Sequence, residues 1–166
     1  SASPFRGVPL AARAQDWEPR VRTVAGPQAW RRWQQCAAAP AWAGSPVWIH
    51  GDPHPLNLLL HNDGTLAGVI DFGDVGAGDP ACDLAAAWLL FDSAARGTFQ
   101  AACTRSGGYD QGCWSRAWAW ALGLACVFAL ASDDMPALAA VAGHGLAETL
   151  ADPVWGRGRP DLSAAG

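Results

Sequence analysis

Apolar residues recur at helical spacing along much of the chain. They predict an amphipathic helix over residues 28–39, with Trp30 and Trp33 on its apolar face and Pro40 after its end. Further helices are predicted near residues 80–91, 112–131 and 135–151. The longest uncharged apolar stretch, 117–131, is shorter than the ~20 residues that span a bilayer. A buried helix is therefore expected there, and no membrane partner.

A strand-like pattern replaces the helical one in the middle of the chain. Two β-like runs, Leu56–His61 and Thr65–Ile70, are separated by Asn-Asp-Gly, a strong hairpin signal. A three-residue loop over residues 63–65 would place Asn57 opposite Asp71, and directly opposed Cβ atoms lie about 4.5–5.5 Å apart. We therefore expect these two side chains to meet at the open end of the hairpin, with Asp52 on the loop that leads into it.

Such a group of oxygen atoms suits one kind of chemistry. Amide and carboxylate oxygens are hard ligands, and Mg²⁺ binds one or two carboxylates together with phosphate oxygens and water. A separate carboxylate nearby can orient a hydroxyl group and accept its proton. Phosphoryl transfer from a nucleotide needs these parts, because its catalysis consists mainly of positioning and charge neutralisation.

Composition narrows the class of protein. The chain has 166 residues, 51% hydrophobic and 16% charged, which suits one folded domain and excludes general disorder. Its net charge of −4 argues against a nucleic-acid partner. Five Cys at irregular spacing, without C-x-x-C, predict neither a zinc site nor a disulfide framework. With no signal-peptide pattern at the first residues, a cytoplasmic location is expected.

Three segments resemble a known family. His50–Asn57 reads H-G-D-P-H-P-L-N and Ile70–Asp74 reads I-D-F-G-D, and together they resemble the aminoglycoside phosphotransferase family of kinase-like enzymes. They are a variant of the protein-kinase H-R-D-x-x-x-x-N and D-F-G pair, with Gly51 where protein kinases carry Arg. Gly78–Ala85 looks like the family's next segment. The resemblance implies an α+β, mostly helical fold: a protein-kinase-like C-terminal lobe with a small catalytic β-hairpin.

The resemblance also implies roles for individual residues. Asp52 matches the catalytic aspartate, which orients the acceptor hydroxyl. Asn57 and Asp71 match the ligands of Mg²⁺. The implied reaction moves a γ-phosphoryl group from ATP or GTP to a hydroxyl group of a small molecule.

Other residues of these segments are expected to support the site. His50 matches a histidine that holds the catalytic loop, and His54 and Asp74 are predicted as further supporting residues. Asp79 is predicted to cap the helix that follows Pro80. Asp83 falls in the first turn of that helix, where the helix dipole favours an anion.

Two features expected of a complete nucleotide kinase are missing from the sequence. All 11 basic residues are Arg, so the strand Lys that pairs with the nucleotide phosphates is absent, and no G-x-G-x-x-G precedes a strand. The chain is therefore predicted to be a C-lobe whose N-terminal nucleotide-binding lobe is missing. We expect an irregular segment over 1–27, the lobe over 28–155 with its catalytic loop and hairpin over 48–74, and a tail over 156–166.

The acceptor is expected to be a small molecule, possible substrates including an aminoglycoside or related antibiotic. Only four residues separate Asp74 from Asp79, which leaves no room for the activation segment of a protein kinase. Four acidic residues on the later helices could line the site of a polyamine, or could serve as helix caps and solvated surface: Asp133, Asp134, Glu148 and Asp152.

Two alternatives from other classes remain open. One is a non-catalytic, kinase-like binding module. The other is a dinuclear metallophosphoesterase, in which Asp52 and His54 would form a D-x-H motif and Asp74 or Asp79 would follow. That second alternative requires further His ligands, and His144 is the one histidine in the later part of the chain.

Overall fold

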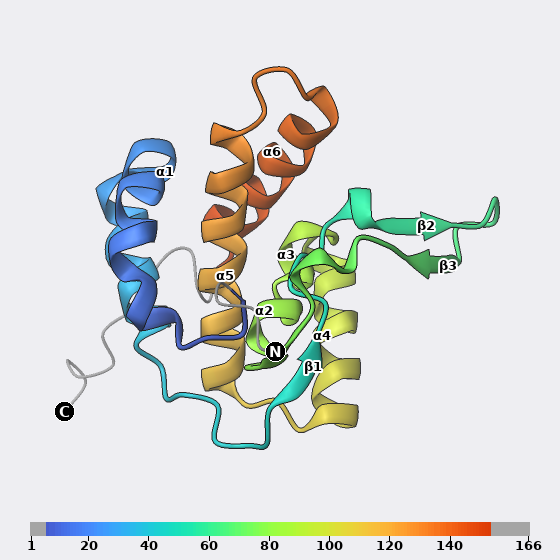
Figure 1. The fold of residues 1–166 in the computed structure, drawn as a ribbon, viewed down its shortest axis with the longest axis horizontal. Coiled ribbons are helices and arrows are strands. Elements are labelled where there is room, and N and C mark those ends of the chain that lie inside the picture. Colours follow the sequence, from blue (N-terminus) through green and yellow to red (C-terminus); the bar gives the residue numbers. More distant parts are fainter. Residues whose placement is uncertain (1–5, 154–166) are drawn as a thin grey trace.

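A computed structural model describes residues 6–153 (Figure 1). The helical segments are η1 (Leu10–Arg13), α1 (Ala14–Ala37), η2 (Pro55–Asn57), η3 (Phe72–Asp74), α2 (Ala81–Leu84), α3 (Ala86–Leu89), α4 (Ser93–Gly107), α5 (Gln111–Leu130) and α6 (Pro136–Ala151). The strands are β1 (Val47–Ile49), β2 (Leu58–Leu60), β3 (Leu66–Val69) and β4 (Gly76–Gly78). The fold is mostly helical with a small hairpin, as the sequence predicted.

Helix α5 forms the centre of the helical body. It packs against α1, α6, α2 and α3, and in Figure 1 it stands between α1 and α6. Most of its side chains are buried, including Trp118 and Trp120. By length and composition α5 could cross a membrane, but 78% of its most apolar window is buried inside the molecule. The prediction of a buried helix at this position is confirmed.

Tryptophan side chains fill the interface between α1 and α5. Trp30 stacks on Trp33 with 4.8 Å between ring centroids. Trp17 meets Trp120 edge to face at 5.7 Å. The Trp33 Nε1–H group donates to the carbonyl oxygen of Ala119 at 2.9 Å, so the indole is buried without losing its hydrogen bond.

The prediction of an irregular segment over residues 1–27 is wrong for its described part. Helix α1 begins at Ala14 and bends at Gly26, whose φ of 87° lies in the left-handed region. Pro27 then occupies the first position of the second half of α1, where its missing N–H costs no hydrogen bond. Pro19 lies inside the first half, because Trp17 and Val21 on the same helix are buried in the core and their packing outweighs the proline.

The region from 80 to 107 also differs from the prediction. The helix expected near 80–91 is divided into the two short pieces α2 and α3, and α4 was not predicted. The side chain of Asp92 caps α4 by accepting a hydrogen bond from the Ala95 N–H at 2.9 Å. Gly108 ends it with a φ of 65°. Its apolar stripe is limited to Phe99 and Cys103, and the charged Arg96 is the most buried residue of this helix.

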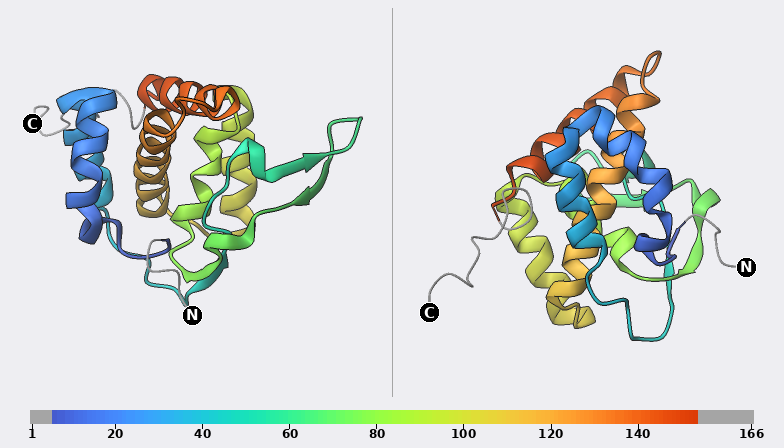
Figure 2. Two further views of the ribbon diagram at one scale, coloured as in Figure 1. Left: turned by 45° about the horizontal axis from the view of Figure 1, so that its top comes forward. Right: turned by 90° about the vertical axis from the view of Figure 1, so that its left-hand side faces the viewer.

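Two strand pairs lie on one side of the helices. Strand β1 pairs antiparallel with β4, which holds the chain before the catalytic loop beside the chain after the D-F-G segment. Strands β2 and β3 form the predicted hairpin. This hairpin projects away from the helical body (Figures 1 and 2).

The predicted register of the hairpin is wrong, by one residue near Asn57 and by two residues near the turn. The Ile70 N–H donates to the Asn57 carbonyl oxygen at 3.0 Å, so Asn57 lies opposite Ile70 and not opposite Asp71. The His61 N–H bonds to the Thr65 carbonyl oxygen, which places the turn at residues 62–64 with Gly64 at a φ of 83°. The pairing is irregular between Leu59 and Leu60. On the turn side Leu60 pairs with Leu66, and on the other side Leu59 pairs with Gly68, so the offset from the prediction falls from two residues to one.

Candidate active site

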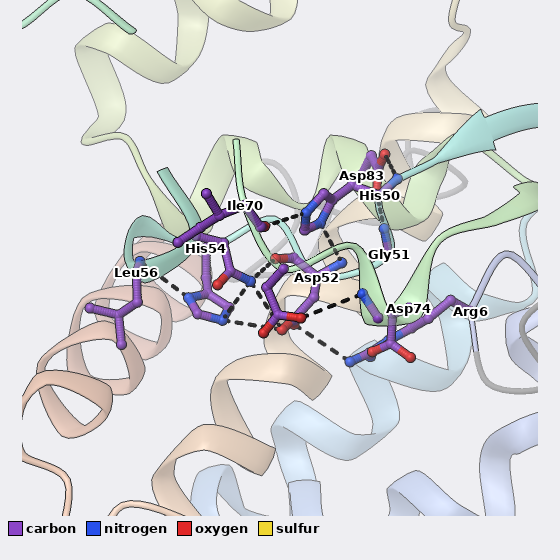
Figure 3. A network of polar contacts seen from close by, with 12 residues as sticks. Arg6, His50, Gly51, Asp52, His54, Leu56, Ile70, Asp74 and Asp83 are labelled. Atoms are coloured by element: carbon purple, nitrogen blue, oxygen red, sulfur yellow. Dashed lines mark hydrogen bonds and ion pairs between the residues drawn. The ribbon is translucent and has the colours of Figure 1, made fainter. Parts of the chain in front are cut away.

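Asp52 lies at the centre of a network of polar contacts on the loop between β1 and η2 (Figure 3). Its Oδ2 atom is 3.2 Å from Nε2 of His54 and 3.3 Å from Nδ2 of Asn57. The Asn57 Nδ2 group also donates to the Asp52 main-chain carbonyl oxygen at 3.0 Å. The D-x-x-x-x-N spacing therefore closes the loop on itself and fixes one edge of the Asp52 carboxylate.

His54 is held so that it donates to Asp52. Its Nδ1 atom accepts a hydrogen bond from the Leu56 N–H at 3.3 Å, which leaves Nε2 to carry the proton that points toward Asp52. The ring is buried and meets Phe128 edge to face at 5.0 Å. His54 was predicted as a supporting residue, and the structure brings it into direct contact with Asp52.

The second carboxylate oxygen of Asp52, Oδ1, has fewer polar partners than Oδ2. Oδ1 is buried and accepts no hydrogen bond from the described part of the chain. The Arg6 guanidinium lies 3.5 Å from it as an ion-pair partner. Burial raises the pKa of Asp52, but the hydrogen bonds from His54 and Asn57 and the charge of Arg6 outweigh this effect, so the pKa lies below its ordinary value. Asp52 is therefore a carboxylate at neutral pH and can accept a hydrogen bond from a hydroxyl group.

Arg6 also connects Asp52 with Asp74. Its Nε–H donates to Asp74 Oδ2 at 3.1 Å. One guanidinium therefore contacts a carboxylate that precedes the hairpin in the chain and another that follows it. Asp74 was a predicted supporting residue, whereas no sequence pattern pointed to Arg6. It lies 68 residues before Asp74 in a segment without periodicity, and no local pattern relates the two.

His50 joins the catalytic loop to the end of β3. Its Nε2–H donates to the Ile70 carbonyl oxygen at 2.8 Å, and its Nδ1 accepts a hydrogen bond from the Asp52 N–H at 3.3 Å. Both contacts fit one neutral tautomer. The ring also meets Phe72 edge to face at 4.9 Å. These contacts hold the loop against the end of the hairpin.

Asp83 holds the same loop from the other side. Its two carboxylate oxygens accept hydrogen bonds from the His50 N–H at 2.7 Å and the Gly51 N–H at 2.8 Å. Burial raises the pKa of Asp83, although these two bonds lower it in part. Its place near a helix start suggested only a dipole interaction, so the sequence missed that Asp83 positions the catalytic loop.

Asp79 has the structural role that the sequence predicted. Its Oδ1 accepts a hydrogen bond from the Ala81 N–H at 3.0 Å at the start of α2. The same carboxylate pairs with Arg116 of α5 at 2.6 Å. It therefore ties the segment after the hairpin to the core helix.

Gly51 lies where no larger residue fits. Its φ is 90°, and a Cβ atom added to it would lie 2.5 Å from the carbonyl oxygen of Asp74. Both the backbone conformation and the contact therefore require glycine at this position.

The two predicted Mg²⁺ ligands lie at the same end of the hairpin. Asn57 pairs with Ile70, and Asp71 is the next residue. The Nδ2 group of Asn57 is engaged by the loop, which leaves its Oδ1 atom as the possible metal ligand. Asp71 is exposed in the left-handed region at φ 62° and ψ 68°. One carboxylate and one amide oxygen fit Mg²⁺, which takes its other ligands from water and phosphate.

A metal centre of another kind gains no support. Residues 6–153 contain no group of three or more His, Cys, Asp or Glu side chains placed to hold a metal ion. The dinuclear metallophosphoesterase would need such a group.

Two of the four acidic residues on the later helices are already engaged. Glu148 accepts a hydrogen bond from Arg96 at 2.7 Å, and Asp152 lies 3.5 Å from the same guanidinium. The Trp88 Nε1–H group also donates to Asp152 at 2.9 Å. These contacts favour the structural alternative for Glu148 and Asp152 over an acidic wall around a polyamine.

The family follows from comparison with known proteins. The sequence model described as "Phosphotransferase enzyme family" (APH) matches residues 3–123. The chain belongs to this family. Its helical body and hairpin are those of a kinase-like phosphotransferase, as the motifs around Asp52 and Asp71 implied.

Individual relatives are more distant. The chain is 35% identical over 63 residues to the uncharacterized protein YcbJ of Bacillus subtilis (strain 168), which covers 37% of this chain and 21% of that protein. The solved structure of a macrolide 2'-phosphotransferase type I is similar over 81% of this chain and 47% of that one, with a TM-score of 0.53 and 26% identity. Macrolide 2'-phosphotransferase MphH from Brachybacterium faecium is similar over 85% and 52%, with a TM-score of 0.48 and 24% identity. The chain thus spans about half the length of these two solved phosphotransferases.

Proposed function

We propose that this chain is the catalytic lobe of a nucleotide-dependent phosphotransferase that acts on a hydroxyl group of a small molecule. The observation that carries the proposal is how the two carboxylate oxygens of Asp52 are hydrogen-bonded. Its Oδ2 atom is fixed by His54 and Asn57, whereas its buried Oδ1 atom accepts no hydrogen bond from residues 6–153. In the proposed complex the acceptor hydroxyl would donate to the Asp52 carboxylate and be oriented for attack on a phosphoryl group.

Asn57 and Asp71 would hold Mg²⁺ in this reaction. The metal would neutralise charge on the nucleotide phosphates when it is bound. In the protein itself, the hydrogen bond from Asn57 to Asp52 couples the metal side of the site to the acceptor side. His50 also couples the two sides of the site, through the backbone, because it contacts both the Asp52 N–H and the Ile70 carbonyl oxygen before Asp71.

A nucleotide-binding lobe would cover the projecting hairpin. Large apolar side chains are exposed on it and beside it: Leu59, Leu60, Leu66, Ile70 and Phe72. Five large apolar side chains exposed on and beside one hairpin indicate a surface that another part of a protein covers. We propose that this lobe supplies the lysine and the phosphate-binding loop that the sequence lacks, and that ATP or GTP binds between it and the hairpin.

The acceptor in this proposal is a small molecule. The segment between Asp74 and Asp79 is taken up by strand β4, which is paired with β1. It therefore offers no free chain to bind a peptide acceptor. The similar solved structure is a macrolide phosphotransferase, which supports an antibiotic or another compound with free hydroxyl groups.

The test is a pair of substitutions in the chain joined to a nucleotide-binding lobe. Phosphoryl transfer from labelled ATP and GTP would be measured with a panel of hydroxyl compounds over a range of Mg²⁺ concentrations. Asp52→Asn should lower kcat by about 10²–10⁴-fold at every Mg²⁺ concentration, the range typical of a lost proton acceptor. Asp71→Asn should also lower kcat, but raised Mg²⁺ should restore part of it, because mass action compensates for weaker metal binding.

The alternatives give different results. Equal rescue of both variants, or rescue of neither, would contradict the roles assigned to Asp52 and Asp71. Binding of nucleotide with no transfer to any acceptor would indicate a non-catalytic module. The chain without a nucleotide-binding lobe should transfer phosphate very poorly, and rapid turnover by it would contradict the assignment of a C-lobe.

A further inference from the structure

The segment that carries Arg6 is fixed against the two strands that flank the catalytic loop. The Asp79 N–H donates to the Gly7 carbonyl oxygen at 3.1 Å, next to the end of β4. The backbones of Gly7 and Gly78 are in contact, since a Cβ atom added to Gly78 would lie 2.7 Å from the Gly7 Cα atom. A Cβ atom on Gly7 would lie 2.8 Å from Cδ1 of Ile49, at the end of β1. The backbone next to Arg6 therefore has a fixed position relative to the catalytic loop.

The side chain of Arg6 passes over Gly51. A Cβ atom added to Gly51 would lie 3.1 Å from Cγ of Arg6 and 3.0 Å from Cβ of Asp74, so the glycine leaves the room that both side chains occupy. Gly51 stands where protein kinases carry the arginine of H-R-D. In this chain an arginine does lie next to Asp52, but a distant segment of the sequence supplies it.

The guanidinium of Arg6 contacts two carboxylates at once. Its Nε–H donates to Asp74 Oδ2 at 3.1 Å, and its Nη2 atom lies 3.5 Å from Asp52 Oδ1. The Arg6 side chain is 15% exposed, so solvent screens these ion pairs only weakly. Because the buried Oδ1 atom accepts no hydrogen bond from residues 6–153, Arg6 supplies the positive charge beside it. Figure 3 shows Arg6 and Asp74 on the side of Asp52 that faces away from His54.

We propose that Arg6 is a positioning residue for phosphoryl transfer, which holds the Asp52 carboxylate in the orientation that the acceptor hydroxyl requires. This role rests on the proposed function and extends it to a residue outside the two sequence motifs. Asp74 fixes the guanidinium through its hydrogen bond, and the guanidinium holds Oδ1 of Asp52. His54 and Asn57 hold Oδ2. The carboxylate is thus held at both oxygens and cannot rotate without losing a contact.

Kinetics of the chain joined to a nucleotide-binding lobe test this role. Arg6→Gln should lower kcat by about 10- to 100-fold, the effect of a misplaced reacting group. The KM values for nucleotide and acceptor should stay unchanged, because Arg6 acts through Asp52 and not by binding either molecule. Arg6→Lys should recover part of the loss, since an ammonium group keeps the charge but lacks the fork that contacts two carboxylates.

Arg22→Gln is the matched control. Arg22 is exposed on α1 and pairs with Glu18 at 2.7 Å, so its loss should leave kcat unchanged. Circular dichroism would confirm that the variants are folded. Should Arg6→Gln fail to fold, the comparison of Arg6→Lys with the natural sequence decides, and a fall in kcat is expected there as well.

NMR spectra of the chain by itself test the contacts without any phosphoryl transfer. The Nε–H signal of Arg6 would be assigned by its loss in Arg6→Gln. In Asp74→Asn this proton should exchange with water about tenfold faster, because a neutral amide oxygen accepts a weaker hydrogen bond than a carboxylate. At one fixed pH, the ¹³Cγ signal of Asp52 should shift in Arg6→Gln and stay in place in Arg22→Gln.

The outcomes separate the role of Arg6 from the proposed function. Transfer that is unaffected by Arg6→Gln, or that falls equally in Arg22→Gln, would overturn the positioning role while the phosphotransferase function stands. A raised KM for the acceptor at unchanged kcat would also overturn it, since Arg6 would then be a binding residue. An Asp52 signal that does not respond to Arg6→Gln would exclude the contact itself. Contacts confirmed by NMR without transfer to any acceptor would contradict the proposed function and leave Arg6 with a structural role only.

Discussion

The Nε2–H group of His50 donates to the carbonyl oxygen of Ile70 at 2.8 Å. This one bond joins the loop that carries Asp52 to the strand end that precedes Asp71. Because the Ile70 N–H is bonded to Asn57, all three residues with proposed roles in phosphoryl transfer are connected within a few bonds of this contact. The geometry of the site thus depends on the hairpin and the loop being held together.

Loss of the His50 ring should loosen this connection. His50→Ala removes the donor to Ile70 and the acceptor of the Asp52 N–H. We expect the free energy of unfolding to fall by about 0.5–1.5 kcal/mol, the net contribution of a typical hydrogen bond, because these groups are exposed or half-buried and water can replace the lost partner. Hydrogen exchange of the amide groups of β2 and β3 should become faster. His61→Ala is the control, since His61 is exposed at the tip of the same hairpin, and its effect should stay within about 0.5 kcal/mol. Equal exchange rates in the two variants would contradict the role of His50.

Helix packing predicts a second result. A Cβ atom at Gly123 of α5 would lie 2.5 Å from the buried ring of Trp17. Gly123→Ala should therefore destabilise the protein, because overpacking costs about 1–3 kcal/mol, more than the ~1 kcal/mol that alanine gains in a helix. Gly143→Ala on α6 has open space around it and should raise the stability by up to ~1 kcal/mol. Thermal unfolding of both variants would show opposite shifts in Tm. A rise in Tm for Gly123→Ala would contradict the packing of α1 on α5.

The burial of Asp83 predicts that the free energy of unfolding depends on pH. Asp83→Asn removes one of the two acceptors for the His50 and Gly51 N–H groups, and at pH 7 it should cost about 1–3 kcal/mol of unfolding free energy. Burial raises the pKa of Asp83 in the folded protein above its value in the unfolded chain. The folded state then binds the proton more tightly, so this group favours folding more as the pH falls through its folded pKa.

The measurement is urea unfolding of both proteins at several pH values from 7 to 4. The stability difference between the natural protein and Asp83→Asn should increase as the pH falls. A difference that shrinks over this range would mean that the pKa of Asp83 is lowered on folding. An unchanged difference would mean that folding does not shift it.

Local patterns in the sequence predicted local structure well. The Asn-Asp-Gly turn indicated the hairpin, and the spacing from Asp52 to Asn57 indicated a loop that closes on itself, because each depends on residues close together in the chain. The contacts of Arg6 and Asp83 with this loop were not predictable in the same way. Arg6 lies 46 positions before Asp52, and Asp83 lies 32 positions after Gly51, so only the packing of the whole lobe brings them together.

Other differences have equally physical causes. Helix α4 was missed because its most buried residue is Arg96, which binds Glu148, and only Phe99 and Cys103 continue an apolar stripe on the same face. The register of the hairpin was missed because turn position and strand irregularity are set by backbone geometry. A shift of one residue turns every side chain to the other face, so the relative placement of Asn57 and Asp71 could not be fixed from alternation alone.

Gly51 has a consequence for how the loop around Asp52 is ordered. In kinases that are switched by phosphorylation, arginine side chains bind the new phosphate and order the activation loop. Here no side chain fits beside the Asp74 carbonyl oxygen, and the residues that follow are fixed in β4. The catalytic loop is already ordered by Asp83 and His50, without any added charge. The arrangement of this loop is therefore set when the chain folds, and no added phosphate is needed to bring Asp52 to its partners His54 and Asn57.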